Sequence, residues 1–412
     1  MAKVFAVAEP LFDSQIEVQA YYLHGKNSDS LFDADVKNSG DALQSPTLDI
    51  VGQMGTEPFA GSYPMFVPVN EFQLLSGLPA SLGIFPSKLI VVVGKDIPFN
   101  GAVYQKCEDL KEQGYELAAE GLLGSISPDL FFELFDYLIL DYLSQNFKRD
   151  FTAMRPHIFK IKFVINNVPS MEAFDSVSKL HGAMFSGDFY SAPVTKGSGE
   201  ISPIKMNALH LLGQINQEDF ELIDVAEIIE RDAALSVSLL RFINSAGGFR
   251  GTKRVESIRQ AVAIMGQNEV KRWATVAITS QLGEDRPSEI TRLSLLRGKF
   301  AENLADAYEL GMLKSGLFIS GLLSLLDVIL QKPMAEAIAD VAVDARIHNA
   351  LVNKRGIIYE VMELIIAFGR CDWYGVAVNL YRNKVNADLV AQAFIDALVW
   401  YRELLERMEE EE

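Results

Sequence analysis

The chain has 412 residues, an apolar fraction of 49% and a formal net charge of −18. This length suggests two or three domains, and the apolar content is ample for buried cores. Both halves of the chain are acidic, which argues against nucleic acid as the main partner, because phosphate contacts need clustered Lys and Arg. The two cysteines, Cys107 and Cys371, offer no disulfide framework and fit a reducing cytoplasm.

The pattern of apolar residues argues against a membrane protein. The longest apolar run, Leu317–Leu326, is followed by Asp327 and is far shorter than the roughly 20 residues that cross a bilayer. The first residues, Met1–Asp13, are more typical of a strand than of a signal peptide. We therefore expect a soluble cytoplasmic protein.

The first 200 residues alternate between strand-like and helix-like segments. The predicted strands are Val4–Ala8, Val18–Leu23, Met65–Val69, Leu89–Val93, Tyr115–Ala119, Leu138–Tyr142, Ile158–Ile165 and Ala183–Phe185. The predicted helices between the later strands are Gly101–Gln113, Leu130–Tyr137 and Ser170–Lys179. This alternation favours an α/β domain with a largely parallel sheet.

A change of composition at Ala192–Pro203 marks the best domain boundary, because this segment is rich in Pro, Gly, Ser and Thr. Everything after it is helical in pattern. Two consecutive helices are predicted at Val255–Met265 and Asn268–Leu282, on either side of Gly266. The run Ser315–Leu330 is predicted as the most apolar and most buried helix.

The segment Ile228–Gly248 predicts one complete amphipathic helix. Asp232 is placed to cap its N-terminus, because a carboxylate there accepts from free amides of the first turn. Apolar residues such as Leu235 and Leu239 recur at helical spacing, and Gly247–Gly248 supplies a stop. By pattern alone this is a core helix of an all-helical domain.

The same segment carries the run Arg-Asp-x-x-Leu-Ser-x-x-Leu-Leu-Arg-x-x-Asn-Ser-Ala, which starts at Arg231. This run resembles HDOD domains, the non-catalytic relatives of HD-type phosphohydrolases. The resemblance continues through Lys253–Gly266 to Trp273. It implies structural or interaction roles for Asp232, Leu235, Leu239, Arg241, Asn244, Ser245 and Trp273.

The metal ligands of HD enzymes are absent from the matching segment. Where those enzymes read Gly-Leu-Leu-His-Asp, this chain reads Gly321–Leu325, with Ser324 and Leu325 in place of the His-Asp pair. The five histidines of the chain show no ligand spacing either. The resemblance therefore implies a helical HDOD domain without a metal.

Residues 1–193 resemble an EAL domain, the (β/α) barrel that hydrolyses cyclic di-GMP with carboxylates around two metal ions. The resemblance begins at Ala20–Lys26, which matches the family's opening signature Ala-Tyr-Glu-Leu-x-x-Arg. Tyr22 replaces the metal-binding Glu, and Lys26 replaces the substrate-contacting Arg. Both changes remove groups that the family's chemistry needs.

The later EAL motifs are degenerate as well. The paired aspartates are represented by Glu120 and Gly121, and the Lys-x-Asp strand keeps only Asp141. Both acids of the late Ala-Glu-x-Val-Glu segment are lost at Ile165–Pro169. The two remaining acids, Glu120 and Asp141, are expected to be vestigial, and the resemblance implies no catalytic residue, no cofactor and no metal.

A local basic cluster between two predicted helices has two interpretations. Its members are Arg250, Lys253, Arg254, Arg259, Lys271 and Arg272. The first interpretation is a solvated face that flanks the helices, and the second is a docking patch for an acidic partner or a nucleotide phosphate.

Together the two halves resemble the bacterial EAL–HDOD two-domain signalling proteins. The expected domains are a degenerate EAL-like barrel (1–193), a linker (194–203), an all-α HDOD domain (204–407) and an acidic tail (408–412). The expected function is non-catalytic signal transduction through an unknown protein partner, with homodimerisation as an option. The alternatives are a receptor for cyclic di-GMP or another nucleotide, and a weak metal-dependent phosphodiesterase that uses Glu120 and Asp141. Binding of cyclic di-GMP is not expected.

Overall fold

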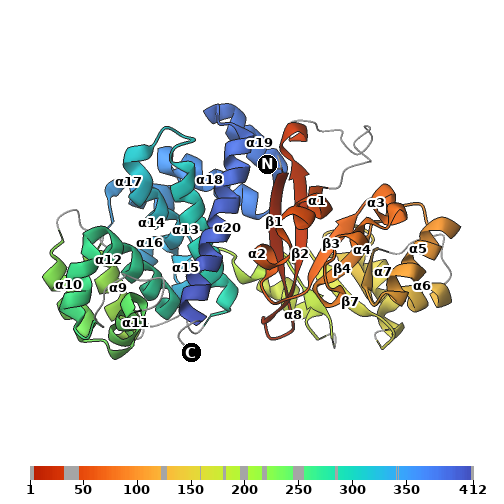
Figure 1. Ribbon diagram of the computed structural model, residues 1–412, viewed down its shortest axis with the longest axis horizontal. Coiled ribbons are helices and arrows are strands. Elements are labelled where there is room, and N and C mark those ends of the chain that lie inside the picture. The colour runs from red at the N-terminus through yellow and green to blue at the C-terminus, as the bar shows by residue number, and fades with distance from the viewer. Residues whose placement is uncertain are drawn as a thin grey trace. The chain divides into compact units, whose positions relative to one another are not determined.

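The computed structural model describes most of the chain, and the described residues form two compact units (Figure 1). The described ranges are 4–31, 46–121, 128–157, 159–179, 182–194, 203–215, 220–244, 255–283, 286–339, 341 and 343–409. The first unit consists of residues 1–192 and 366–391, and the second consists of residues 193–365 and 392–412.

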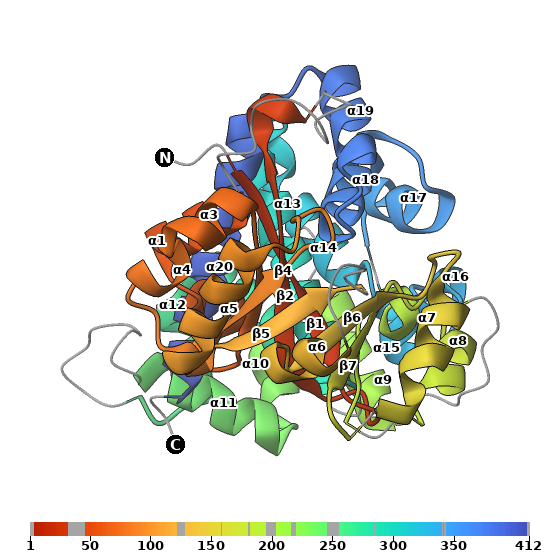
Figure 2. The same ribbon diagram turned by 90° about the vertical axis from the view of Figure 1, so that its right-hand side faces the viewer.

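Eight strands of the first unit close into a barrel in chain order (Figure 2). They are β1 (Val4–Phe12), β2 (Val18–Asn27), β3 (Met65–Val69), β4 (Leu89–Val93), β5 (Glu116–Glu120), β6 (Tyr137–Asp141), β7 (Lys162–Asn166) and β8 (Met184–Phe185). Strand β1 is antiparallel to both neighbours, and every other pair is parallel. A tight turn explains the antiparallel pair, because a short connection can join only antiparallel strands. The expected α/β barrel is thereby confirmed.

Helices connect the parallel strands and lie outside the barrel (Figure 2). They are α1 (Pro46–Met54), α2 (Glu57–Ala60), α3 (Glu71–Ser76), α4 (Leu78–Ser81), α5 (Gly101–Glu112), α6 (Pro128–Leu134), α7 (Phe147–Met154) and α8 (Met171–Val177). Several begin at a polar cap. Asn100, for example, accepts from the amides of Ala102 and Val103 at 3.0 and 3.1 Å.

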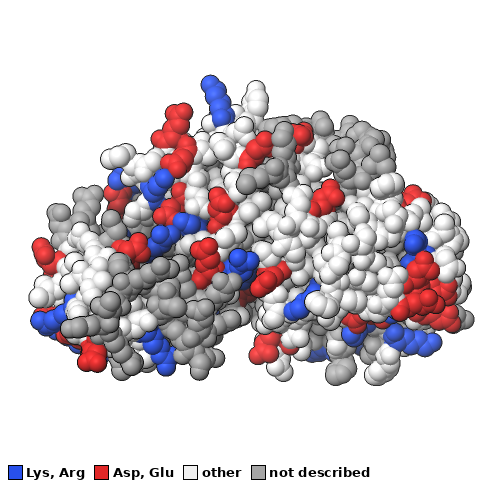
Figure 3. Space-filling model, in the orientation of Figure 1, with Lys and Arg blue, Asp and Glu red and all other residues white. Residues whose placement is uncertain are grey.

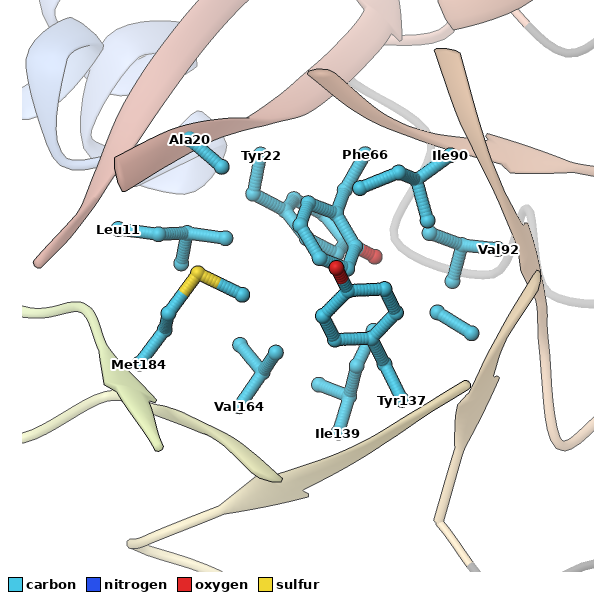
Figure 4. Packing of buried hydrophobic residues seen from close by; sticks show 11 residues of the cluster. Leu11, Ala20, Tyr22, Phe66, Ile90, Val92, Tyr137, Ile139, Val164 and Met184 are labelled. Atoms are coloured by element: carbon cyan, nitrogen blue, oxygen red, sulfur yellow. The ribbon is translucent and has the colours of Figure 1, made fainter. Parts of the chain in front are cut away.

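The barrel interior is a packed core of side chains (Figure 4). Alternate strand residues such as Ile90 and Val92 point inward, as the twofold repeat of a strand requires. The cluster comprises Leu11, Ala20, Tyr22, Phe66, Ile90, Val92, Ala118, Tyr137, Ile139, Val164 and Met184. Two tyrosines are thus built into a largely apolar interior.

The second chain segment of the first unit, residues 366–391, packs against β1. It contains the end of α18 (Ile357–Gly369), all of α19 (Trp373–Asn383) and the start of α20 (Ala387–Glu409). The ring of Phe5 lies 5.5 Å from the ring of Phe368 and 5.9 Å from that of Trp373. Residues 366–391 therefore group with the barrel, although they fall within the range 204–407 expected for the helical domain.

The second unit is helical throughout its described residues. Its helices are α9 (Pro203–Ile215), α10 (Leu222–Glu230), α11 (Ala233–Asn244), α12 (Ile258–Leu282), α13 (Ser288–Leu304), α14 (Lys314–Leu323), α15 (Leu326–Leu330), α16 (Met334–Ala337), α17 (Ala345–Asn353), and parts of α18 and α20. In α12, Gly266 has φ 74° and ψ 171°, which breaks the helix. The predicted break between two helices at Gly266 is confirmed.

Residues 228–231, which were grouped with the predicted helix Ile228–Gly248, end α10, and α11 starts directly after Asp232, the predicted cap. The run Ser315–Leu330, predicted as one helix, is split into α14 and α15 because Leu325 has non-helical angles (φ −116°, ψ 16°). The continuous apolar pattern of this run gave no indication of the break. Of the described helices, none is long and apolar enough to cross a membrane.

Candidate functional site

The carboxyl ends of the parallel strands gather polar residues at one end of the barrel. Glu120, Asp141 and Asn166 are the last residues of β5, β6 and β7, and Ser186 follows β8. Parallel strands place their carboxyl ends at the same end of a barrel, where loop and strand-end residues form active sites. This end is therefore the candidate site.

Tyr22 dominates the candidate site. Its side chain projects from β2 into the barrel interior and is only 4% exposed (Figure 4). The hydroxyl donates a hydrogen bond of 3.1 Å to Oε1 of Glu120. One oxygen of the Glu120 carboxyl group is therefore occupied by a hydrogen bond from the phenol of Tyr22.

A second polar pair lies beside Tyr22. His24 Nε2 and Glu9 Oε2 are 2.7 Å apart, and the ring of His24 lies 4.7 Å from the ring of Tyr22. Neither residue was among the predicted site residues. The sequence around Glu9 and around His24 does not indicate that the two side chains meet. The antiparallel register of β1 and β2 brings them together.

Burial, followed by the charges and hydrogen bond of Glu120 and then the charge of Glu9, raises the pKa of Tyr22 well above 10.0. The neutral phenol is therefore favoured in the folded protein. Its stabilising effect is complete below pH 10.0 and is lost as the pH rises towards the raised pKa, because the unfolded chain then ionises first.

Tyr22→Phe should lower the free energy of unfolding of the barrel by about 1.5–3 kcal/mol at neutral pH, because it removes a hydrogen bond to a charged group. The variant should also lose stability less steeply than the wild type above pH 10.0. Denaturant unfolding at neutral and alkaline pH measures both effects. Tyr63→Phe, which removes an exposed hydroxyl from the same unit, is the control. Equal slopes for Tyr22→Phe and the wild type would contradict the prediction.

The side chain of Asp141 accepts hydrogen bonds from neighbouring loop residues. It is exposed, and Oδ1 accepts from the amide of Leu143 and from Nδ2 of Asn167, both at 3.0 Å. In the described residues no hydrogen bond joins it to Glu120. Throughout these same ranges, no group of three or more His, Cys, Asp or Glu side chains is arranged to hold a metal ion.

Polar side chains at the end of α14 and on α15 contact other parts of the helical unit. Ser324 follows the end of α14, and its hydroxyl accepts from Nη1 of Arg297 on α13 at 3.2 Å. Asp327 on α15 is buried and accepts from the amide of Val194 at 3.2 Å. Burial raises the pKa of Asp327, against the opposing effect of backbone hydrogen bonds. Ser324 and Asp327 therefore make contacts within the helical unit.

Most of the predicted HDOD signature residues that the structure describes form a helix cap or are buried. Asp232 caps α11, as predicted: Oδ1 accepts from the amide of Leu235 at 3.0 Å, and Oδ2 accepts from Gln281 at 3.2 Å. The side chains of Leu235, Leu239 and Trp273 are buried. Arg241 is exposed on the last turn of α11, and Ser245 lies outside the described residues.

Asn244 connects the end of α11 to the segment before α12. Its Oδ1 accepts from the amide of Val255 at 2.8 Å, while Nδ2 donates to the carbonyls of Val255 and Leu240 at 2.8 and 2.7 Å. Only an amide side chain can accept and donate in this way. The signature Asn therefore holds two backbone segments together.

Asn244→Ala should destabilise the helical unit by about 1–3 kcal/mol, because it removes three hydrogen bonds to backbone groups. Arg241→Ala, one turn earlier and exposed, should stay within about 0.5 kcal/mol of the wild type. Thermal and denaturant unfolding of both variants distinguishes them. A loss that is the same for both would mean that the amide has no special structural role.

The predicted basic cluster is only partly described, and two of its members are paired with acids. Arg259 lies 3.3 Å from Glu230 and 3.7 Å from Glu227, and Arg272 lies 3.4 Å from Glu302. Arg250, Lys253 and Arg254 fall outside the described residues. On the face drawn in Figure 3, the described Lys and Arg side chains are scattered among Asp and Glu.

Comparison with known proteins places the HDOD domain within the helical half, at residues 201–355. Two relatives span nearly the whole chain. The uncharacterized protein YuxH of Bacillus subtilis is 26% identical over 98% of this chain and 99% of its own length. The cyclic di-GMP phosphodiesterase CdgJ of Vibrio cholerae is 21% identical over 98% of this chain and 94% of its own.

Solved structures of low identity are similar to part of the chain. An EAL domain protein from Listeria monocytogenes is 12% identical, covers 46% of this chain and 88% of its own, and has a TM-score of 0.35. The PaMucR phosphodiesterase in complex with cyclic di-GMP is 14% identical, covers 45% and 94%, and has a TM-score of 0.38.

In sequence order, the chain thus has a closed α/β barrel followed by an HDOD domain. This organisation is consistent with the EAL–HDOD proteins, the family that the sequence resembles.

Proposed function

We propose that the protein is a non-catalytic regulator that acts by binding another protein, and that its barrel is a pseudo-enzyme. The observation that carries this proposal is Tyr22, a buried neutral phenol where the family resemblance implies a metal-binding Glu. A phenol held neutral by its surroundings is a hydrogen-bond donor and a poor metal ligand.

The hydrogen bonds of Glu120 and Asp141 support the same proposal. One oxygen of Glu120 accepts from Tyr22, and Asp141 accepts from its own loop. Two-metal hydrolysis needs several carboxylates to hold the ions and orient water. Removing one preorganised electrostatic contact typically costs about 10²–10³ in rate.

One finding favours a second candidate function. The relative CdgJ, similar over 94% of its length, is named a cyclic di-GMP phosphodiesterase. A chain of this organisation could accordingly bind cyclic di-GMP as a receptor, or cleave it slowly with Glu120 and Asp141. Both versions of this alternative predict an interaction with the nucleotide, and the main proposal does not.

Calorimetric titration of the full-length protein with cyclic di-GMP, with and without Mg²⁺, separates the proposals. No heat and no hydrolysis in either condition is the expected result. Saturating heat without hydrolysis would make the protein a receptor and overturn the silent-barrel proposal.

Hydrolysis, should it be measured, is tested with Glu120→Ala. The matched control is Glu116→Ala, at the opposite end of the same strand β5. Activity that disappears in Glu120→Ala but persists in Glu116→Ala would establish a catalytic barrel and contradict the proposal. Activity unchanged in both variants would trace to a contaminating enzyme.

A further inference from the structure

The face of β1 that lines the barrel interior continues beyond the carboxyl end of the neighbouring strand β3. Alternate residues of a strand share a face, so Phe5 and Glu9 lie on the same face as Leu11, a member of the interior cluster. The register pairs Glu9 with Tyr22 and Phe5 with Lys26. Lys26 is four residues beyond Tyr22, whereas β3 ends three residues beyond the partner of Tyr22. Phe5 therefore lies at the mouth of the barrel, on the side of the candidate site.

Residues 366–373, which we call the strap, cover this part of β1. The ring of Phe368 lies 5.5 Å from that of Phe5, and the ring of Trp373 stacks on Phe5 at 5.9 Å with an interplanar angle of 23°. Phe5 is fully buried, and Phe368 is 1% exposed. Contacts between aromatic rings add to the gain from burying their apolar surface. The strap therefore has an apolar anchor at the barrel mouth.

Polar contacts hold the same chain segment to residues that follow the two strands flanking β1. In the strap, Nε of Arg370 lies 3.3 Å from Oδ1 of Asp188, which follows β8. Further along the segment, Asp388 at the start of α20 accepts a hydrogen bond of 2.8 Å from the hydroxyl of Ser28, directly after β2. Both contacts lie beyond the carboxyl ends of these strands. The segment is therefore attached at the rim of the barrel mouth.

Cys371 brings the strap close to the polar residues of the candidate site. Burial, followed by the charge of Glu9, raises the pKa of the Cys371 thiol well above 9.0. The effect of a charge falls with distance, so the thiol lies near the Glu9 carboxylate. Glu9 in turn lies 2.7 Å from Nε2 of His24, and the rings of His24 and Tyr22 are 4.7 Å apart. The strap thus lies beside the polar cluster formed by Glu9, His24 and Tyr22.

We propose that the strap is a built-in gate, which limits access to His24 and Tyr22 and must move before a nucleotide-sized ligand can reach them. A ligand that occupies the mouth and a closed strap exclude each other, so binding at the site favours the open strap. The strap includes the end of α18, whose first part belongs to the second unit, so the chain connects the gate directly to the helical half. This inference adds a regulatory element to the proposed function and does not depend on whether the barrel binds or cleaves a nucleotide.

Modification of histidines by diethyl pyrocarbonate, resolved by peptide mass spectrometry, measures access behind the strap. In the full-length wild type, His24 should react slowly, and His348, exposed on α17 of the second unit, should react readily. Trp373→Ala removes the stacked ring and should speed the reaction of His24 about tenfold, because the strap opens locally. His348 should be unaffected. The matched control is Tyr374→Ala, which removes the next ring along the chain, 81% exposed, and should react like the wild type.

Maleimide labelling of the two cysteines distinguishes an open strap from an unfolded barrel. Cys107 is fully buried on α5 and reports global unfolding, whereas Cys371 reports the strap itself. Trp373→Ala should label Cys371 about tenfold faster than the wild type does while Cys107 stays protected. Arg370→Gln, which removes only the ion pair with Asp188, should give a smaller increase.

Three results would overturn the proposal. The first is a wild type in which His24 reacts as fast as His348. The second is a folded Trp373→Ala variant, with Cys107 protected, in which His24 and Cys371 react no faster than in the wild type. The third is an increase at Cys371 that always accompanies labelling of Cys107, because the strap would then open only when the whole barrel unfolds.

Discussion

Gly321→Ala should destabilise the helical unit by about 3 kcal/mol or more, because it introduces a methyl group where two helix backbones touch. A Cβ at Gly321 on α14 would overlap the carbonyl of Arg297 on α13, and it would lie 2.6 Å from the amide nitrogen of Gly298. Backbone atoms cannot move aside as the end of a flexible side chain can, so the helices would have to separate. Circular dichroism during thermal and denaturant unfolding measures the loss.

Gly316→Ala, on the same helix, is the matched control. A Cβ there would make ordinary contact with Ile347 at 3.8 Å. Replacing a helical glycine without a clash should raise stability by about 0.5–1 kcal/mol. If the two alanine variants unfolded alike, α13 and α14 would not be packed with their backbones in contact.

Phe5→Ala should destabilise the barrel unit by about 3–5 kcal/mol, as is usual for a buried aromatic ring in a core. The ring is fully buried between the barrel and the segment that contains Phe368 and Trp373. Phe72→Ala, at an exposed position on α3, should change stability by no more than about 0.5 kcal/mol. Denaturant unfolding followed by tryptophan fluorescence reports on the packing of Trp373.

A chain that ends at residue 193 tests the same packing more severely. It keeps all eight strands but lacks residues 366–391, so the Phe5 ring would lose Phe368 and Trp373 and would face water. We expect this fragment to aggregate or to unfold far below the melting temperature of the full-length barrel. A fragment as stable as the barrel of the intact protein would show that residues 366–391 are dispensable.

Local signals accounted for much of the fold. Strands β3 and β4 have the bounds that the sequence predicted, because short apolar, β-branched runs between turn residues are typical of buried strands. The cap at Asp232 and the break at Gly266 were also predictable, since each depends on the chemistry of one residue beside its own helix. The barrel and the HDOD domain were expected from such segments and from their resemblance to known families.

Contacts between distant residues were not predictable in this way. Tyr22 and Glu120 are 98 residues apart, and nothing near either residue indicates that a hydrogen bond joins them. The apolar run Ser315–Leu330 predicted one helix, because periodicity cannot show that Leu325 leaves the helical region. Both features depend on packing partners from other parts of the chain.

The sequence by itself determined the order of strands and helices, which follows from local composition and spacing. The helical HDOD half was expected from a family resemblance and is confirmed by the family match at residues 201–355. Only the tertiary structure decided that the Tyr22 hydroxyl engages Glu120, that Asn244 joins two backbone segments, and that residues 366–391 complete the barrel unit. The reason is physical. Burial and hydrogen bonds between residues far apart in the sequence form only when the chain folds, so a short segment cannot predict them.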